Sequence, residues 1–595
     1  MSGTEVGLFA VISLLALALF LRSLYRLFAL LCLGRWENRF DHLGARVRGV
    51  LLYAFGQRRV IGEKFGWNHF FIFWGFMALL LVNTEFLIGG IFPRFSFSFL
   101  GPVLYGALLL VADVMSLVVL VAVVVAAVRR GLFRPAHIEP TWDAYIILAL
   151  IGSLMIAYFG LHACELRVDG SEWAQWTPVS RLLSDWAARF PVERLQVAAR
   201  TFWWIHGLVL LFFLVYLPYG KHLHIITAIP NCFFRSLSFV RTVPRLVFRK
   251  GHRFGVSKVY QFTWKDLLDF YSCTECGRCE AACPAHHTGK PLNPKQVIHA
   301  GKLNLLANGP GILVRRPDSL ASAREHDPAP TPLIGGGQPS VSTSAIWSCT
   351  TCGACMMKCP VFIEHVPKLI GLRRHLVMEQ AAFPPELFNL FENTEQRFNP
   401  WGIAPAERGK WAQDREINVL ADDVQVEYLF FVGCSGAFDS RNRQTAAALA
   451  RILNVARLSW GILGTKEKCC GDPLRRLGNE YVFAELAREN VELFAKYGAR
   501  KIVTFCPHCF TTLKHDYAQF GGSLDVLHHT QLIAELLHQG KLRLRGNADG
   551  RVVYHDSCYL GRYNQVFAEP REILTAACGG TAPTDMPRCR EESFC

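Results

Sequence analysis

Two copies of one cysteine pattern stand in the middle of the chain. Each copy has the spacing C-x2-C-x2-C-x3-C and is followed by proline; the copies are Cys273, Cys276, Cys279, Cys283 and Cys349, Cys352, Cys355, Cys359. Thiolates at this spacing hold iron–sulfur clusters. Zinc sites and disulfides are the alternatives, but structural zinc sites use two separated pairs rather than repeated triplets. The pattern therefore predicts an electron carrier.

The two runs are predicted to share their ligands. Where two such clusters occur together, the fourth cysteine of each run ligates the other cluster. We therefore assign two 4Fe–4S cubanes, the first held by Cys273, Cys276, Cys279 and Cys359 and the second by Cys349, Cys352, Cys355 and Cys283. The two cubanes are then neighbours in one module.

A third cysteine array follows the two runs. Its members are Cys434, Cys469, Cys470, Cys506 and Cys509. Residues 426–432, 501–504 and 551–554 have the composition of short buried strands, and each ends close to a cysteine. Helical stretches at 440–455 and 478–499 separate them, so we expect parallel strands with the cysteines at their carboxyl ends.

Histidines in apolar stretches are the candidates for haem ligands within a membrane. His206 and His224 are 18 residues apart, which is five turns of one continuous helix and about 27 Å along its axis. By depth in the membrane we pair His69 with His224 and His162 with His206, which predicts one or two haem b groups. An interfacial role for each histidine is the alternative, and an exchange of roles between His224 and His222 stays open.

The elements that must carry these histidines are apolar and long. Five stretches, about 5–30, 67–92, 100–128, 143–165 and 201–219, can cross a bilayer core of about 30 Å. The first lacks the features of a cleaved signal peptide and is interpreted as a retained span. The loop Arg35–Lys64 and the turn at Arg129–Arg134 are rich in arginine, so both are predicted to be cytoplasmic. This orientation puts the N-terminus outside and everything after residue 220 on the cytoplasmic side of a bacterial inner membrane.

Cysteine usage and net charge agree with this placement. Of the 20 cysteines, 17 follow residue 270, in a region predicted to face a reducing compartment where clustered thiolates bind metal. The net charge of +15 is explained by cytoplasmic loops and by a basic arm at 235–253, predicted to lie along anionic lipid headgroups. No nucleic-acid-binding motif is present, so lipid and redox partners are expected instead.

Two resemblances refine these sites. Residues 1–230 resemble the five-helix cytochrome b subunit of respiratory nitrate reductase, through Asn68-His69, His206 and His224. That family has a second histidine in span two, where this chain has Leu79; either the outer haem is absent or His162 replaces the ligand. The five-cysteine array resembles the cysteine-rich domain of heterodisulfide reductase catalytic subunits, which implies a non-cubane 4Fe–4S cluster held by these cysteines.

A second copy of the cysteine-rich motif begins near the end of the chain. Cys558 is followed by Cys595 after 36 intervening residues, and the motif goes no further. By the family pattern a second cluster site would need further cysteines, so we interpret the sequence as truncated or as the product of a frameshifted gene, and this site as incomplete. The remaining cysteines, Cys32, Cys164, Cys232, Cys578 and Cys589, fit neither array and are interpreted as incidental.

The predicted fold class is multidomain, α plus α/β. The expected parts are a transmembrane bundle at 1–230, a basic linker at 231–262, a two-cluster ferredoxin module at 263–385, a first cysteine-rich half at 386–545 and a second, shortened half at 546–595. Helical patterns at 291–305 and 366–381 indicate an α-helical ferredoxin, resembling the iron–sulfur subunits of succinate dehydrogenase, glycolate oxidase and heterodisulfide reductase. Residues 308–345, rich in Pro, Gly, Ser and Ala, are predicted to form a loop.

The order of these parts implies a function. No G-x-G-x-x-G motif follows a predicted strand, so the chain has no predicted nucleotide or flavin site and must exchange electrons with a partner. The whole chain, and Cys273–Glu280 and Trp347–Met356 in particular, resembles fused bacterial iron–sulfur oxidoreductases. That resemblance implies an oxidoreductase passing electrons from electron-transfer flavoprotein to menaquinone. The alternatives are a quinol-dependent disulfide reductase and a relay subunit without a substrate.

Overall fold

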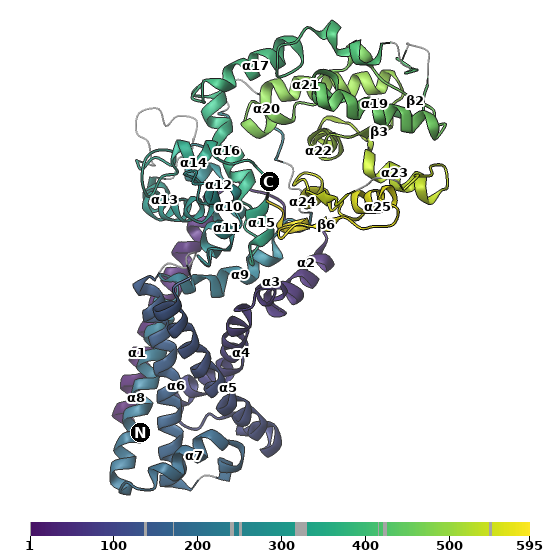
Figure 1. Cartoon of the computed structure of the whole chain (residues 1–595). Helices are drawn as coiled ribbons and strands as arrows, with labels where there is room; N and C mark the ends of the chain where they lie inside the picture. Colours follow the sequence, from purple (N-terminus) through teal and green to yellow (C-terminus); the bar gives the residue numbers. More distant parts are fainter. Residues whose placement is uncertain are drawn as a thin grey trace.

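The computed structural model describes residues 2–594 apart from 136–139, 171, 239–242, 249–252, 316–329, 414–415, 421–424 and 547–549. The molecule is elongated (Figure 1). A bundle of long helices forms one end, the ferredoxin module lies on it, and the cysteine-rich domain forms the other end. The predicted partner of Cys558, Cys595, lies outside the described residues.

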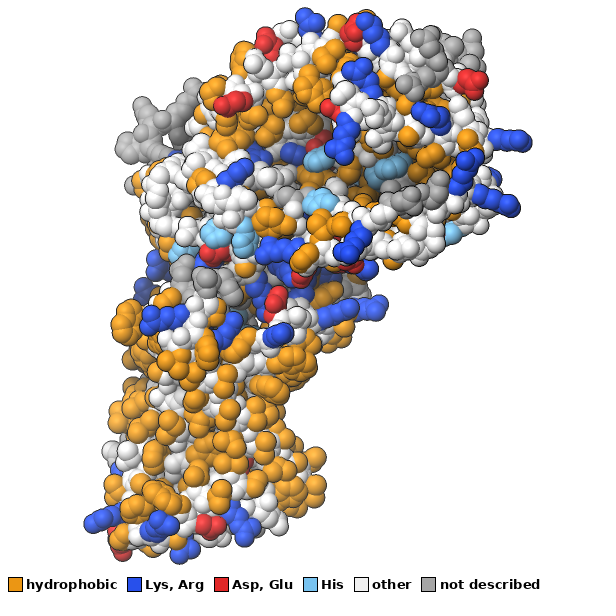
Figure 2. Space-filling model, viewed as in Figure 1, with side chains coloured by type: hydrophobic (Ala, Val, Ile, Leu, Met, Phe, Trp, Pro, Cys, Tyr) orange, Lys and Arg blue, Asp and Glu red, His pale blue; other side chains and the backbone are white. Residues whose placement is uncertain are grey.

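Five of the described helices are long and apolar enough to cross a membrane, as predicted: α1 (Gly3–Leu31), α4 (Gly66–Ile91), α5 (Pro102–Val128), α6 (Trp142–Asp169) and α8 (Val192–Tyr216). Shorter helices join them, namely α2 (Leu43–Gly49), α3 (Arg58–Ile61) and α7 (Pro178–Ala187). Figure 2 shows hydrophobic side chains over the bundle and Lys and Arg side chains gathered where it meets the other modules. An apolar belt bordered by cations is the surface that a lipid bilayer requires, so this is a membrane protein.

The prediction that His206 and His224 share one continuous helix is wrong. Helix α8 ends at Tyr216, a turn follows, and His224 begins the separate helix α9 (His224–Phe233). Pro218 lies in the break, where it cannot donate a backbone hydrogen bond. Asp143 accepts a hydrogen bond from the Lys221 amide at 3.0 Å and secures the turn. The two histidines are therefore placed by different elements.

The ferredoxin module is helical, as predicted. Its helices are α10 (Trp264–Ser272), α11 (Arg278–Ala281), α12 (Pro284–His287), α13 (Pro294–Arg315), α14 (Thr343–Trp347), α15 (Ala354–Lys358) and α16 (His365–Met378). The predicted loop at 308–345 is partly wrong, because its first residues continue α13 and Thr343–Trp347 form α14. Burial of Ile312 and hydrogen bonds from Asn308 to Asn304 and Thr331 hold the end of α13 in place despite Pro310.

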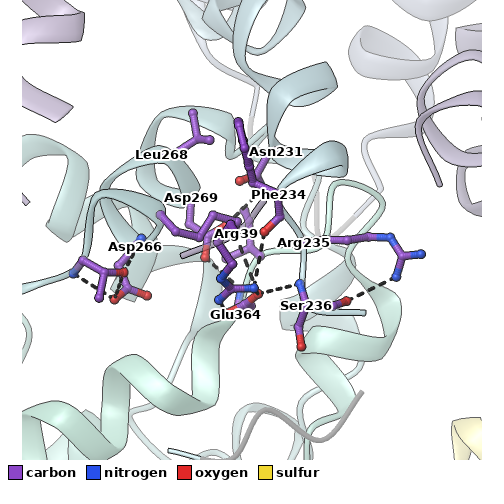
Figure 3. Close-up of polar contacts among 12 residues, drawn as sticks. Arg39, Asn231, Phe234, Arg235, Ser236, Asp266, Leu268, Asp269 and Glu364 are labelled. Atoms are coloured by element: carbon purple, nitrogen blue, oxygen red, sulfur yellow. Dashed lines mark hydrogen bonds and ion pairs between the residues drawn. The ribbon is translucent and has the colours of Figure 1, made fainter. Parts of the chain in front are cut away.

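A buried polar network docks the ferredoxin module on the membrane domain (Figure 3). Arg39, from the loop after α1, donates two hydrogen bonds to the Glu364 carboxylate at 3.2 and 3.0 Å. Asn231 of α9 donates to Asp269 at 3.0 Å and to the Val361 carbonyl at 2.8 Å. Because these groups are buried and paired across the boundary, the two parts are held in one orientation.

The cysteine-rich domain contains a four-stranded sheet in the order β2-β1-β3-β4, with all neighbours parallel. The strands are β1 (Tyr428–Phe430), β2 (Trp460–Gly461), β3 (Lys501–Thr504) and β4 (Asp525–His528). The main helices around it are α17 (Glu386–Arg397), α18 (Gly433–Phe438), α19 (Ser440–Val455), α20 (Asp472–Leu477), α21 (Glu480–Lys496), α22 (Pro507–Thr511) and α23 (His529–His538). Parallel strands separated by helices were predicted from the sequence.

The predicted strand at 551–554 does not join this sheet. Only Val553–Tyr554 is a strand, β5, and it pairs with β6 (Thr584–Asp585) in a separate two-stranded sheet. The edge beside β3 is taken by β4 instead. With α24 (Gly561–Asn564) and α25 (Ala568–Ala577), this C-terminal segment lies beneath the cysteine-rich domain, toward the ferredoxin module (Figure 1).

Part of the basic arm packs on protein. The Pro244 carbonyl accepts a hydrogen bond from Arg374 at 2.9 Å, and the Val243 carbonyl accepts one from Arg475. The Arg245 amide donates to Gln519 at 2.7 Å. Residues 243–245 therefore pack against α16 and the cysteine-rich domain. Their carbonyls accept hydrogen bonds from buried arginines, whose N–H groups need acceptors inside the protein.

Candidate redox centres

The first predicted cubane set comes together around one cavity. Its wall contains Cys273, Cys276, Cys279 and Cys359. Helix α10 ends just before the first of these residues, and the loop before α16 supplies the last. Glu275 and Gly277 have positive φ angles of 52° and 74°, which wrap this loop around the cavity. The cysteine contributed by the other run completes the set of four thiols, as the crossed arrangement requires.

The second run has the same loop shape. Thr351 and Gly353 have φ angles of 55° and 75°, matching Glu275 and Gly277 in the first run. Burial raises the pKa of the Cys355 thiol well above its usual value. The neighbouring thiols of Cys352, Cys349 and Cys283 raise this pKa further. The four cysteines predicted for the second cubane are therefore grouped as well.

These thiol groups have the chemistry that a cluster needs. Buried thiols stay protonated when their thiolates would repel one another, unless a cation stabilises the thiolates, and cluster iron supplies that charge. Within the described residues, no three His, Cys, Asp or Glu side chains converge on a point where a single metal ion would sit.

The five-cysteine array is continuous in the structure. Its thiols interact in succession, in the order Cys434, Cys469, Cys470, Cys509 and Cys506. Cys434 follows β1 in α18, while Cys506 and Cys509 follow β3, so they lie at the carboxyl ends of parallel strands as predicted. The interaction with the neighbouring Cys509 thiol lowers the pKa of Cys506 to about 6.

The surroundings of this array include residues that the sequence did not point to. Arg408 donates to the Cys434 sulfur at 3.3 Å and forms an ion pair with Glu467 at 2.9 Å. Glu467 in turn accepts hydrogen bonds from the amides of Val432 and Gly433, both at 2.9 Å. Glu467 lies two residues before the pair Cys469 and Cys470, so its position in the sequence could have pointed to it. Arg408 is 26 residues from the nearest cysteine of the array, so nothing in the sequence links it to the site.

Cys558 lies beside the second cubane run rather than in the five-cysteine array. It is buried in a small cluster with Cys352, Tyr559 and Tyr563. The hydroxyls of Tyr559 and Tyr563 hydrogen-bond to Thr351 at 2.6 Å each, through its side chain and its carbonyl respectively. The segment that follows β5 therefore covers the cubane loop.

One aromatic contact connects this segment with the five-cysteine array. The His508 ring stacks on Tyr559 with ring centres 4.0 Å apart. His508 lies between Cys506 and Cys509 in the chain. The array and the second cubane run are thus joined through two stacked side chains and a hydrogen bond to Thr351.

His69 and His224 face each other, although they come from different helices. Their ring centres are 6.4 Å apart. Metal–imidazole bonds are about 2 Å long and each ring centre lies roughly 1 Å beyond its nitrogen, so two histidines on one iron would have centres about 6 Å apart. The Nδ1 atom of His69 bonds the Gln57 side chain at 3.1 Å, and that of His224 bonds the Lys221 carbonyl at 2.6 Å. In both rings Nε2 is then the nitrogen suited to bind iron.

The outer pair is arranged differently. His206 Nε2 bonds the Asn83 amide oxygen at 2.9 Å, and its buried Nδ1 has no hydrogen-bond partner. The His162 ring lies edge-on against Tyr158, with ring centres 4.4 Å apart, and its Nδ1 atom lies 3.2 Å from the Glu165 carboxylate. These two helices are described in full at both sites, and no ring contact joins His162 to His206. Of the two predicted pairs, His69 and His224 are the pair whose rings are in contact among the described residues.

Comparisons with known proteins agree with these sites. Residues 272–363 match the 4Fe-4S dicluster domain family and residues 428–514 the cysteine-rich domain family. The chain is 36% identical to an EtfAB:quinone oxidoreductase of Syntrophomonas wolfei, over 98% of this chain and 85% of that protein. It is 34% identical to the probable iron-sulfur-binding oxidoreductase FadF of Bacillus subtilis, over 99% of this chain and 87% of that protein. The chain belongs to this family of iron–sulfur oxidoreductases.

More distant relatives match about half of the chain. One is a component of the dihydromethanophenazine:CoB–CoM heterodisulfide reductase of Methanosarcina barkeri, which is 30% identical over 55% of this chain and 78% of that protein. No solved structure matches. Membership in the family makes the protein a membrane-bound iron–sulfur oxidoreductase related to heterodisulfide reductases.

Proposed function

We propose that the protein passes electrons from a soluble flavoprotein, electron-transfer flavoprotein, to menaquinone. The donor binds on the cytoplasmic side of a bacterial inner membrane, with the N-terminus of the chain outside. The name of the Syntrophomonas relative supports both the flavoprotein and a quinone as partners. Menaquinone rather than another quinone rests on the family resemblance alone.

The proposed carriers form a row. The non-cubane cluster is held by Cys434, Cys469, Cys470, Cys506 and Cys509, and the two cubanes by the crossed cysteine sets. The stacked His508 and Tyr559 support direct exchange between the non-cubane cluster and the second cubane. The first cubane is then the one that exchanges electrons with the membrane.

The observation that carries the proposal is the His69–His224 pair, with ring centres 6.4 Å apart. A haem b bound there would supply one-electron chemistry at the end of the row. The chain's own contribution is to fix both Nδ1 atoms through Gln57 and Lys221, so that each imidazole keeps one orientation. A second haem at His162 and His206 is not part of the proposal, since His206 Nε2 bonds Asn83.

The test mixes the purified protein with reduced electron-transfer flavoprotein and a menaquinone analogue. We expect the haem b absorbance to show reduction within the turnover time and the quinone to be reduced. Absence of haem from the purified protein would refute the haem assignment, and failure of the flavoprotein to reduce any cluster would refute the donor.

A quinol-dependent disulfide reductase is the second candidate. The similarity to the heterodisulfide reductase component of Methanosarcina barkeri, together with the five-cysteine array, favours it. In the same preparation, turnover of a disulfide substrate with quinol, without a response to the flavoprotein, would support this candidate over the first.

A further inference from the structure

We propose that two clamps fix the first cubane against the histidine pair, one through Lys221 and Glu275 and the other through Gln57 and Arg59. Both are positioning contacts for electron exchange between the cubane and the haem. The inference rests on the proposed function, because it names the residues that set the geometry of one of its steps. With both groups bound, one electron would pass from the reduced cubane to the oxidised haem, and no bond would be formed or broken.

The first clamp starts at His224. The Lys221 carbonyl accepts the hydrogen bond of His224 Nδ1 at 2.6 Å. The Lys221 ammonium forms an ion pair with Glu275 at 2.9 Å. Glu275 lies in the loop between Cys273 and Cys276, at a positive φ of 52°. One residue thus holds the haem histidine with its backbone and the cubane loop with its side chain.

The second clamp starts at His69. Gln57 hydrogen-bonds His69 Nδ1 at 3.1 Å. Two residues later, the Arg59 guanidinium donates to the Cys359 carbonyl at 2.9 Å and lies 3.8 Å from the centre of the Phe362 ring. Arg278, from the ferredoxin module, donates back to the Arg59 carbonyl at 2.7 Å. This short segment therefore connects the other histidine with the fourth cysteine of the same cubane.

The two clamps converge on one cluster. Cys273, Cys276 and Cys359 all line the first cavity. The Lys221 and Glu275 side chains are 19% and 17% exposed, so their ion pair is shielded from solvent and holds its geometry better than a surface pair. The structure thus gives the first cubane two independent attachments to the residues that face the haem.

The Lys221 clamp is tested with Lys221→Met, Glu275→Gln and the double variant, with the exposed Lys290→Met as the matched control. The clusters are reduced with a viologen, which bypasses the flavoprotein, and haem reduction is followed by absorbance while the cubanes are followed by EPR. We expect each single variant to slow haem reduction on the order of tenfold while reduced cubane accumulates. The double variant should be no slower than Glu275→Gln, because that substitution already removes the Lys221 pair together with the contact of Glu275 with His299 at 3.4 Å.

Haem content should be unchanged, because His224 is held by a backbone carbonyl that the substitution keeps. Lys221→Arg should restore most of the rate. Wild-type rates in Lys221→Met, additive effects in the double variant, or loss of haem would each overturn the Lys221 clamp. If the wild-type protein itself passes no electron from cubane to haem, the proposed function fails instead, so the two failures are distinguishable.

The Arg59 clamp is tested with Arg59→Gln against its exposed neighbour Arg58→Gln. Arg59→Gln should slow haem reduction by a similar factor and leave the cubane EPR signals in place, whereas Arg58→Gln should match the wild type. Equal rates in the two variants would overturn this clamp.

Discussion

Asp269 is the centre of the buried network that joins the ferredoxin module to the membrane domain, and replacing it with asparagine should destabilise that junction. Its carboxylate accepts hydrogen bonds from Lys265 at 2.6 Å, from Lys368 at 2.5 Å and from Asn231 at 3.0 Å. Asp269, Lys265 and Lys368 are almost fully buried. An uncharged side chain at this position would leave two buried ammonium groups short of a counter-charge.

The size of the effect follows from what each lysine retains. In Asp269→Asn, Lys368 keeps Asp266 at 2.9 Å, but the other carboxylate near Lys265 is Glu364 at 4.0 Å. Breaking a buried ion pair lowers the free energy of unfolding by about 3–5 kcal/mol. Because Lys368 still has Asp266 as a partner, we expect a loss near the lower end of that range. At roughly 2–4 °C per kcal/mol, a loss of about 3–4 kcal/mol lowers the melting temperature by about 6–16 °C.

The assay is thermal loss of cluster absorbance in detergent-solubilised protein. Asp525→Asn, at an exposed site, is the matched control and should melt like the wild type. The double variant Lys265→Met/Asp269→Asn should recover part of the loss, because it removes the stranded ammonium group. If Asp269→Asn melts with the control, the network does not hold the junction and the reasoning is refuted.

The same residue predicts a pH dependence. Burial alone would raise the pKa of Asp269, but Lys265 and Lys368 lower it below its usual value. A lowered pKa means that the stabilisation is fully present above about pH 4, the value for an unfolded aspartate, and disappears as the pH falls through the folded pKa. The difference between wild type and Asp269→Asn should therefore close only in acid.

Three further predictions concern the redox sites. Cys359→Ser should alter the EPR signal of the first cubane and Cys283→Ser that of the second; the opposite result would refute crossed ligation. His224→Ala should remove the haem that the clusters reduce, while His206→Ala should keep it, and loss of haem in both would point to a second ligand pair. Arg408→Gln removes a charged hydrogen bond to a cluster sulfur, worth about 1.5–3 kcal/mol, so the non-cubane potential should fall by about 60–130 mV in an EPR redox titration; an unchanged potential would contradict this.

The sequence was most informative where the chemistry is local. The spacing within each cysteine run, the five apolar stretches and the strand–helix alternation around Cys434 and Cys506 all depend on residues close together in the chain. The structure agrees with these patterns. The structure differs at Pro218, where a helix predicted to be continuous is broken. It also differs near Ile312, whose burial extends a helix into a predicted loop.

By itself, the sequence determined that this protein binds iron–sulfur clusters and lies in a membrane, because ligand type, ligand spacing and apolar length are properties of short segments. The tertiary structure alone decided which distant groups meet. It brings His224 to His69 from a separate helix, joins Lys221 to Glu275, and packs Tyr559 between two cysteine arrays. Such contacts join residues from about 50 to more than 200 positions apart, and they depend on how whole modules pack rather than on any periodicity in the chain.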